Sequence, residues 1–571
     1  MLNEVKTAQN LLLKLKDLLF EYTWCIPSAT NDSLNDISLY DHSISTMTIS
    51  LALACSDNKD NPFVIFAADV SGIQQFIFQS KYASFSGAAK IFRARSFIIN
   101  SISTAYKLEV SKALDIIPFF DLIDAGGKFT FMLPNLDNID SKLDKLQEEQ
   151  ELFFINNYLG TLCVLVDYSV KVSTNALLME NFRQTLSDVS FNLNKKKSRK
   201  FEKVLNLDNW ILNDIDVDNK KRCTACGTRT TPDEYCSNCN EQYILGGDIP
   251  QLKNISFIDS NNSTFQLTKN IALSYKKDDK NTFSLVDSDL YPRWRINNYT
   301  PENESFSDIA SDAVVDGIGK NFLAYIKIDV DNMGELFYSG IPDDIYSLSR
   351  YITISRMFNQ FFNTTVKSYI KEKFSHIYTV ISGGDDLFVI APWNQAIEFV
   401  LNINDKFNEL CCNNAKLHFS TGIVVSGCNT PFALVNEESS SALDDKAKEE
   451  ENKNSICYFD TIFSYDELRL LLTRHLDIMR FISDEKIKLS HGFIYRVYNY
   501  INDRLSNNEM KNYSSYSQLH YDLARNVIEK KNSDKISEVA EFFLQINKMN
   551  KKELEQYRVM LIHTLYSIRK S

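Results

Sequence analysis

Two segments of the chain contain the same succession of apolar runs and turns. This repeat constrains the fold more than any other feature. Each begins with an apolar strand that ends in Asp (Phe63–Asp69 and Phe322–Asp329), continues into a helical stretch, and reaches a Gly-Gly turn between two further strands. The interval from Asp to turn is 57 residues (69 to 126) in the first copy and 54 residues (329 to 383) in the second. A helix and a strand complete each copy. The sequence therefore predicts a duplicated β-α-β-β-α-β unit.

The chain has 571 residues, which is too long for one hydrophobic core. We expect five regions: a helical region at 1–60, a first β-α-β-β-α-β unit at 61–200, a linker at 201–320, a second unit at 321–460 and a helical region at 461–571. The two repeated regions are called the first unit and the second unit below. An α+β multidomain fold is predicted.

The formal net charge of −12 argues against a free-standing, non-specific nucleic-acid binder. It does not exclude a subunit whose RNA is held mainly by partners. No apolar run approaches the roughly 18 residues that a membrane span needs, and the first residues lack a signal-peptide pattern. Seven of the eleven Cys are scattered, which suits a reducing compartment. We expect a cytoplasmic protein with no membrane partner.

Three carboxylates are predicted to meet in the second unit. Asp385 and Asp386 lie at the tip of a hairpin between the apolar runs HIYTVI and LFVIA. Two adjacent carboxylates are costly there unless a cation neutralises them. In a β-α-β-β-α-β sheet the first strand lies beside the hairpin, so Asp329 should join them. Three converging carboxylates suit two Mg²⁺ or Mn²⁺ ions.

Phosphate groups are expected beside these carboxylates. The glycines Gly383 and Gly384 allow a ligand to approach the backbone closely, and Asn332–Gly334 opens a helix whose free N–H groups can receive phosphate oxygens. Lys446 and Lys448 follow the last strand and either reach a triphosphate or lie on the surface. The pattern favours nucleotidyl transfer, with Asp329, Asp385 and Asp386 catalytic. The alternative is an acidic hairpin tip beside an N-capping Asp.

The first unit lacks this acidic pair. Its turn is Ala125-Gly126-Gly127-Lys128, and Asp69 alone cannot hold two metal ions. We predict a catalytically silent unit that still binds a nucleotide, with Gly126 and Gly127 leaving room for it and Lys128 meeting phosphate. The alternative is a purely structural duplicate.

Four cysteines in the linker form two CxxC pairs. Cys223 and Cys226 are separated from Cys236 and Cys239 by nine residues. Two such pairs place four thiolates around one Zn²⁺ and leave no coordination position open, so a structural zinc is predicted. The alternative, a redox dithiol pair, does not explain two matching pairs.

Two further clusters are less informative. Asp41-His42 is the chain's only Asp/His doublet, and no His is followed by Asp, so an HD-type metal nuclease site is not expected there. Asp41 is interpreted as a helix-start residue. The basic stretch Lys195–Lys200 either touches RNA or, as we favour, forms a solvated helix face.

Taken together, the strings SLYDHS, DVSGIQQFIF, KYASFSGAAKIFRARSF, KIDVDNMGELF, SGGDDLF, HGFIYRVYNYINDRL and YDLARNV and the CxxC pairs resemble the large palm-domain subunit of type III CRISPR–Cas interference complexes, in its Csm-type branch. The resemblance covers nearly the whole chain in the same order. It implies two ferredoxin-like palm/cyclase domains, the first degenerate, a zinc-ribbon linker and a C-terminal helical bundle.

The resemblance also implies a function. On binding target RNA, such a complex joins ATP into cyclic oligoadenylates, with one ATP in each palm. It implies that Asp329, Asp385 and Asp386 hold Mg²⁺ and that Ser382, Gly383 and Gly384 contact nucleotide. Guide RNA, target RNA and the other complex subunits are the implied partners.

The chain departs from the family at its N-terminus, where only the tail of the usual HD nuclease domain is recognisable, around SLYDHS. Single-stranded DNase activity is therefore not expected. Two other functions stay open: a diguanylate-cyclase-like enzyme, which the duplication and the CxxC pairs disfavour, and a non-catalytic scaffold subunit of the RNA-guided complex.

Overall fold

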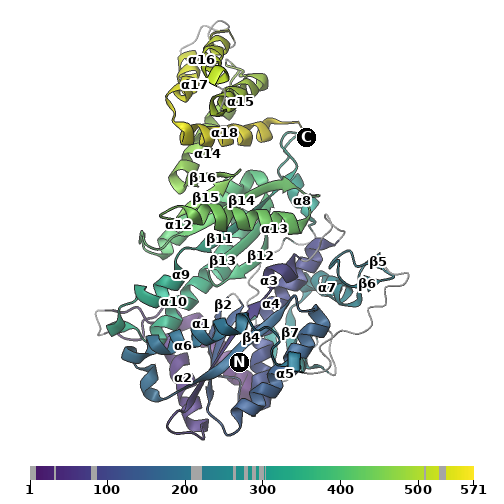
Figure 1. Ribbon diagram of the computed structural model, residues 1–571, viewed down its shortest axis with the longest axis vertical. Coiled ribbons are helices and arrows are strands. Elements are labelled where there is room, and N and C mark those ends of the chain that lie inside the picture. Colours follow the sequence, from purple (N-terminus) through teal and green to yellow (C-terminus); the bar gives the residue numbers. More distant parts are fainter. Residues whose placement is uncertain are drawn as a thin grey trace.

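The computed structural model describes most of the chain, in the ranges 8–30, 34–78, 87–125, 127–206, 221–260, 265–275, 281–285, 291–294, 301, 304–485, 487–506, 509–525 and 535–570. The molecule is elongated, with the first unit at one end, the second unit in the middle and helices α14–α18 at the other end (Figure 1). The predicted multidomain α+β class is confirmed.

The first unit contains one four-stranded antiparallel sheet in the order β2-β3-β1-β4. Its elements are β1 (Phe63–Ser71), α3 (Ile73–Ile77), α4 (Ala88–Leu114), β2 (Asp121–Ala125), β3 (Lys128–Pro134), α5 (Ile139–Tyr158) and β4 (Cys163–Val172). Alternate residues of β1 enter different cores, because neighbouring side chains of a strand point to opposite faces. Val64 and Phe66 join the core under α4 and α5, whereas Phe63 and Ile65 join a second core with α6 (Met179–Lys197).

The second unit repeats this arrangement and extends it. Its elements are β11 (Phe322–Val330), α9 (Met333–Glu335), α10 (Leu348–Gln360), α11 (Lys367–Lys373), β12 (Tyr378–Gly383), β13 (Asp386–Pro392), α12 (Ala396–Leu410), β14 (Phe419–Gly427), α13 (Phe432–Ser441), β15 (Ser455–Tyr458) and β16 (Thr461–Ser464). The six strands have the order β12-β13-β11-β14-β15-β16. The sequence did not predict β15 and β16, and the helical stretch expected between the first strand and the hairpin is interrupted by a π-helical turn at Phe361–Val366.

The two units share a hydrophobic core. Helix α4 of the first unit packs against β12 of the second, where Tyr378 donates to the Ala89 carbonyl at 2.9 Å and Ser96 donates to the Val380 carbonyl at 2.5 Å. Apolar side chains of both sheets, such as Phe66 and Tyr325, belong to one buried cluster. The relative position of the units is therefore fixed by packing rather than by a linker.

The region between the units holds a second small sheet that the sequence did not reveal. Its strands are β7 (Asn254–Asp259), β8 (Phe265–Gln266), β9 (Ile271–Ser274) and β10 (Thr282–Ser284), and helix α7 (Ser237–Asp248) precedes it. Near the N-terminus, the expected helical region contains two helices, α1 (Ala8–Thr23) and α2 (Leu39–Cys55), and residues 24–38 between them are not helical where described.

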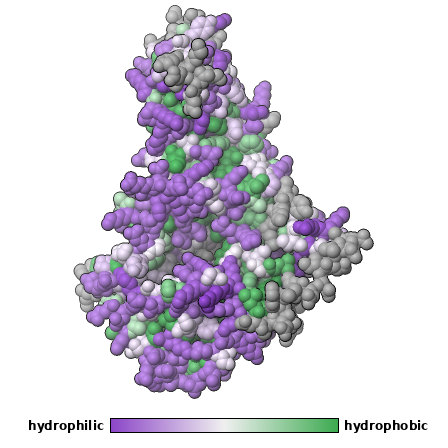
Figure 2. Space-filling view, viewed as in Figure 1, coloured by the Kyte–Doolittle hydropathy of each residue, from purple (hydrophilic) through white to green (hydrophobic). Residues whose placement is uncertain are grey.

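The C-terminal region is helical, as predicted, with α14 (Tyr465–Ser483), α15 (His491–Leu505), α16 (Glu509–Leu523), α17 (Lys535–Leu544) and α18 (Lys551–Ile568). None of the helices in the described ranges has the length and apolar character needed to cross a membrane. Hydrophilic residues dominate the face shown in Figure 2, and hydrophobic ones appear there in separate groups.

Two buried histidines contribute to the contact between this helical region and the second unit. The rings of His475 (α14) and His563 (α18) pack edge to face with centroids 4.6 Å apart. Tyr458 of β15 hydrogen-bonds His563 Nδ1 at 2.9 Å, and Thr564 hydrogen-bonds His475 Nδ1 at 3.0 Å. Burial lowers the pKa of His475 to about 4, and burial followed by the charge of His475 lowers the pKa of His563.

This pair predicts an acid-sensitive contact. An unfolded histidine titrates near pH 6.5, so the stability that neutral His475 supplies is complete above that pH and is lost as pH falls toward 4. At pH 5 we expect a loss of ~2 kcal/mol. Protection factors of amides in α14 and α18, each rate being compared with the intrinsic exchange rate at the same pH, should fall between pH 7 and pH 5 in the wild type and in a His42→Gln control, and less steeply in His475→Gln. Equal pH dependence in His475→Gln would contradict the assignment.

Candidate active site

Strand pairing brings the three predicted carboxylates together. Asp329, near the end of β11, lies directly opposite Asp386, the first residue of β13. Asp385 is in the turn between β12 and β13, where Gly384 has a φ of 67° that favours glycine. One carboxylate oxygen of each of Asp329, Asp385 and Asp386 lies within 4.8 Å of the others. The juxtaposition inferred from the topology is present.

The electrostatics of this trio favour a bound cation. Desolvation and then the charge of Asp329 raise the pKa of Asp385. Desolvation, a hydrogen bond to Asp329 and then the charge of Asp329 raise the pKa of Asp386 above its ordinary value, although Asp386 is exposed. The shifts mean that three negative charges are unfavourable at this distance. Oxygen ligands so arranged suit hard divalent ions such as Mg²⁺ and Mn²⁺.

Lys448 contacts the trio from the segment after α13. Its ammonium forms a short ion pair with Asp329 and lies 3.4 Å from Asp444. The predicted position of Lys448 beside the site is therefore present. Lys446, named together with Lys448, instead pairs with Asp460 on an exposed turn at 2.8 Å.

The loop after β11 is held by a buried carboxylate that the sequence analysis did not single out. Oδ2 of Asp331 accepts from His418 Nδ1 at 2.8 Å, from Ser420 at 2.9 Å and from the Asn454 backbone at 3.1 Å. Asn332 accepts from Lys453 at 2.6 Å. Asp331 thus ties this loop to β14 and to the turn before β15. Its position two residues after Asp329 was the available signal.

Two features of this loop and hairpin bear on the predicted nucleotide contacts. The helix expected to open at Asn332–Gly334 has only three residues, Met333–Glu335, before a π-helical turn, so it offers a short loop rather than a long helix N-terminus. Ser382 is buried and its hydroxyl donates to the Phe362 carbonyl at 2.8 Å, so that hydroxyl points into the protein rather than toward a ligand. Gly383 is likewise buried.

One asparagine connects the Gly-Gly turn of the second unit to strand β2 of the first. Asn359 of α10 accepts from the Gly384 backbone at 2.9 Å and donates to the carbonyl of Asp124 in the first unit at 3.0 Å. Asn363 donates to Asn359 at 2.7 Å. No sequence pattern indicated this role, because an isolated Asn in an amphipathic helix resembles any surface residue.

Two cavities lie between the units. The larger, about 500 Å³, is lined by Lys128, Thr130 and residues of α6 from the first unit, and by Gly334, Phe337, Gly384 and Asp385 from the second. The smaller, about 180 Å³, is lined mainly by polar side chains, among them Asn100, Ser103, Asn359 and Asn363. Nε1 of Trp294 and Oδ1 of Asn363, in the lining of the smaller cavity, are buried and have no hydrogen-bond partner among the described residues. Both cavities have room for parts of a ligand with polar edges.

The first unit carries the equivalent positions without the acidic pair. Asp69 lies opposite Lys128 across β1 and β3, as Asp329 lies opposite Asp386. Gly127 lines the smaller cavity, whereas Gly126 is outside the described residues. Lys197 of the basic stretch forms an ion pair with Asp69 at 3.0 Å, so this lysine is not simply part of a solvated face.

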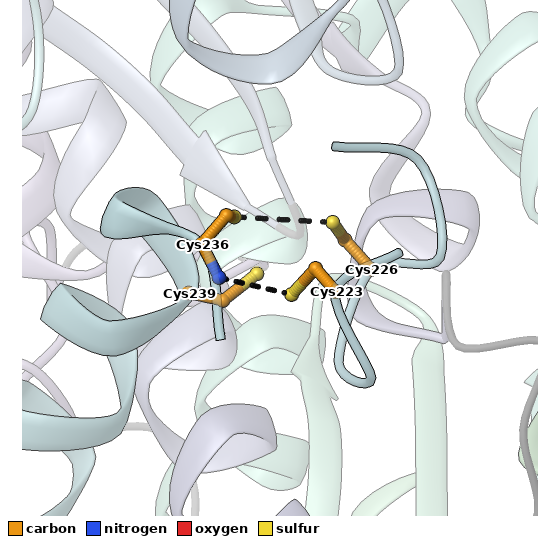
Figure 3. A group of neighbouring side chains, drawn as sticks. All are labelled: Cys223, Cys226, Cys236 and Cys239. Carbon is orange, nitrogen blue, oxygen red and sulfur yellow. Dashed lines mark hydrogen bonds between the residues drawn. The ribbon is translucent and has the colours of Figure 1, made fainter. Parts of the chain in front are cut away.

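The four linker cysteines form a buried cluster (Figure 3). Their four Sγ atoms lie within 4.8 Å of one another, and Cys226 Sγ and Cys236 Sγ are 4.0 Å apart. That separation is close to the ~3.8 Å between sulfurs in a tetrahedral zinc site with Zn–S bonds of about 2.3 Å. It is far too long for a disulfide. Arg95 of α4 donates to Cys239 Sγ at 3.8 Å and links the cluster to the first unit.

Asp41 has a structural partner. Its buried carboxylate accepts a bidentate pair of hydrogen bonds from Arg356 of α10, from Nε to Oδ1 at 2.7 Å and from Nη2 to Oδ2 at 2.8 Å. Among the described residues, the groups of potential metal ligands are the cysteine cluster and the Asp329 trio. Within that part of the chain, Asp41 and His42 therefore belong to no metal-ligand group.

Comparison with known proteins agrees with this architecture of two similar units and one acidic site. The family model for the second palm domain of Cas10/Cmr2 matches residues 322–457, and that for Csm1 subunit domain B matches residues 62–213. The chain belongs to the Cas10/Csm1 family of type III CRISPR systems, and the predicted family is confirmed.

The individual relatives share only a low sequence identity with this chain. The CRISPR system single-strand-specific deoxyribonuclease Cas10/Csm1 (subtype III-A) of Enterococcus italicus is 26% identical, over 85% of this chain and 68% of that protein. A Csm1–Csm4 cassette in complex with cA4 superposes with a TM-score of 0.74 at 18% identity, covering 100% of this chain and 79% of that one. A Csm1–Csm4 cassette in complex with one ATP superposes with a TM-score of 0.73 at 20% identity, covering 100% of this chain and 80% of that one.

The relative's name conflicts with the expectation that DNase activity is absent. That name belongs to the relative. The contacts of Asp41 concern only the part of this chain that surrounds this residue. The absence of DNase activity stays a prediction.

Proposed function

We propose that this chain is the nucleotidyltransferase subunit of a type III CRISPR complex and converts ATP into cyclic oligoadenylates when the complex binds target RNA. The observation that carries the proposal is the trio of Asp329, Asp385 and Asp386 at the edge of a cavity of about 500 Å³ that both units line. The family membership and the ATP and cA4 named for similar structures support the same chemistry.

Each unit is proposed to be a ferredoxin-like palm, within the bounds 61–200 and 321–460. The linker at 201–320 is proposed to contain a zinc ribbon, and 461–571 to be a C-terminal helical domain. The strand orders β2-β3-β1-β4 and β12-β13-β11-β14 support equivalent folds for the two palms.

The trio fits two Mg²⁺ or Mn²⁺ ions by its donor set and because desolvation, followed by the proximity of Asp329, raises the pKa of Asp385 and Asp386 and so disfavours their unneutralised charges. Such a pair of ions, when bound, stabilises the attacking and leaving oxygens of an in-line displacement. Asp329, Asp385 and Asp386 would hold the ions. The loop of Asn332 and Gly334 and the ammonium of Lys448 would orient the phosphates.

Two nucleotides are proposed to meet between the palms. A 3′-hydroxyl of one attacks the α-phosphate of the other, the new phosphodiester bond forms, and the bond to pyrophosphate breaks. Asn359 bonds Gly384 in the turn of the second palm and Asp124 at the end of β2 in the first, and so helps to fix the distance between the two binding sites. Positioning of this kind supplies much of the rate enhancement in bimolecular reactions.

The proposed partners are the other complex subunits, guide RNA and target RNA. The Csm1–Csm4 pairing named for similar structures supports a Csm4-type partner. With a net charge of −12, the chain itself is poorly suited to hold RNA without basic partners.

The assembled complex incubated with ATP, Mg²⁺ and target RNA, with products resolved by mass, tests this proposal. We expect cyclic oligoadenylates only when target RNA is present. Turnover of GTP instead of ATP would favour a diguanylate-cyclase-like enzyme. A complex that binds target RNA and turns over neither nucleotide would leave a scaffold role.

A further inference from the structure

The first unit places lysines at the positions of the catalytic machinery of the second. In β1 and β3, Lys128 occupies the place opposite Asp69 that Asp386 occupies opposite Asp329. Directly opposed residues of two strands lie on the same face, with Cβ atoms about 5 Å apart. A cation in the first unit therefore stands where the second unit has a metal-binding carboxylate.

A second lysine completes the correspondence. Lys197, at the end of α6, pairs with Asp69 at 3.0 Å, and Lys448, after α13, pairs with Asp329. Helix α6 packs on β4 and β1, and α13 packs on β14 and β11, so the two helices cover equivalent faces of equivalent sheets. The lysines reach equivalent strand-end carboxylates although their sequences show no common motif.

The charges of the two sites differ in sign. In the second unit, three carboxylates and Lys448 leave a formal charge of −2, which repels a triphosphate until cations bind. In the first unit, one carboxylate with Lys128 and Lys197 leaves +1. Lys128 is exposed and lines the cavity of about 500 Å³, and the side chain of Lys197 is 48% exposed. Both ammonium groups are accessible to a ligand.

We infer that Lys128 and Lys197 hold the phosphates of a nucleotide in the first unit directly, without a divalent metal ion. The inference rests on the proposed function and adds the means of phosphate binding in the silent unit. Ammonium groups make charge-assisted hydrogen bonds to phosphate. Before a nucleotide binds, the ion pair with Asp69 holds the Lys197 side chain toward the site. When the nucleotide binds, Lys197 exchanges its bond to Asp69 for a bond to a phosphate oxygen.

Titration of the full chain with a non-hydrolysable ATP analogue in EDTA tests this inference. Without metal we expect one analogue bound per chain. Lys128→Met and Lys197→Met should each weaken that binding at least about tenfold, because each removes a charged hydrogen-bond donor. Lys197→Arg should restore it to within about threefold of the wild type.

Lys195→Met is the matched control. This lysine is on the same helix, and its ammonium lies over the Phe191 ring, 4.1 Å from the centroid, rather than beside Asp69. We expect it to bind the analogue as the wild type does. Thermal unfolding of each variant should be unchanged, since Lys128 and Lys197 are at the surface.

Two results would overturn the inference: no binding in EDTA, or binding that survives both lysine substitutions. Its failure is distinguishable from failure of the proposed function. Lysine-dependent binding in EDTA by a complex that forms no oligoadenylate would leave the inference standing and remove the function. Oligoadenylate formation by a complex whose analogue binding does not depend on the lysines would leave the proposed function standing and remove the inference.

Discussion

Asp386→Asn is expected to lower the rate of ATP conversion by about a thousandfold in the assembled complex. The substitution removes one of three carboxylates whose oxygens lie within 4.8 Å of one another, and it leaves the pairing of β11 and β13 intact. A thousandfold corresponds to ~4 kcal/mol of lost transition-state stabilisation, the order expected when a metal ion is lost from a phosphoryl-transfer site. Initial rates of oligoadenylate formation with target RNA present provide the measurement.

Asp460→Asn is the control for this experiment. Asp460 is exposed, pairs with Lys446 and lies in the turn between β15 and β16, away from the trio. Because its φ of 58° is one that Asn also adopts, the fold should be retained. The control should keep the wild-type rate. An Asp386→Asn complex as active as this control would mean that the trio is not the reaction centre.

Cys239→Ser is expected to abolish stoichiometric zinc binding and to loosen the contact between the linker and the first unit. Structural zinc contributes about 10–16 kcal/mol in small zinc-finger peptides, so loss of one thiolate ligand costs a large part of the local stability. Cys239 is in α7, and Arg95 of α4 bonds its sulfur and also donates to the Ile77 carbonyl at 2.9 Å. Zinc content and hydrogen exchange of α7 and α4 report the two effects.

Cys412→Ser is the matched control, since Cys412 is exposed and outside the cluster. It should retain one zinc per chain and wild-type exchange. Should Cys239→Ser keep both its zinc and its protection of α7, the four sulfurs would not be the ligands of a structural ion.

Much of the active-site geometry could be predicted because it follows from local patterns. The hairpin around Asp385 was visible as two apolar runs flanking Gly-Gly, and the topology of a β-α-β-β-α-β unit places its first strand beside that hairpin. Asp329 could therefore be placed next to Asp386 without coordinates. The cysteine cluster was predictable because two CxxC pairs restrict the ligand spacing strongly.

Other features depend on tertiary contacts that no local pattern encodes. Strands β15 and β16 are only four residues long, and they directly follow the acidic stretch Glu437–Asn454, which forms the end of α13 and the turns after it. The direction of the Ser382 side chain depends on which face of β12 meets Phe362. The contacts of Asn359 and Lys197 join residues from different elements, so their sequence context gave no sign of them.

The central claim is that three carboxylates gather a pair of divalent ions beside a bound nucleotide. Anomalous scattering from crystals of the protein with Mn²⁺ and a non-hydrolysable ATP analogue tests it most directly. We predict two manganese peaks about 3.5–4 Å apart, in contact with Asp329, Asp385 and Asp386. A bound analogue with no manganese at these carboxylates would contradict the account.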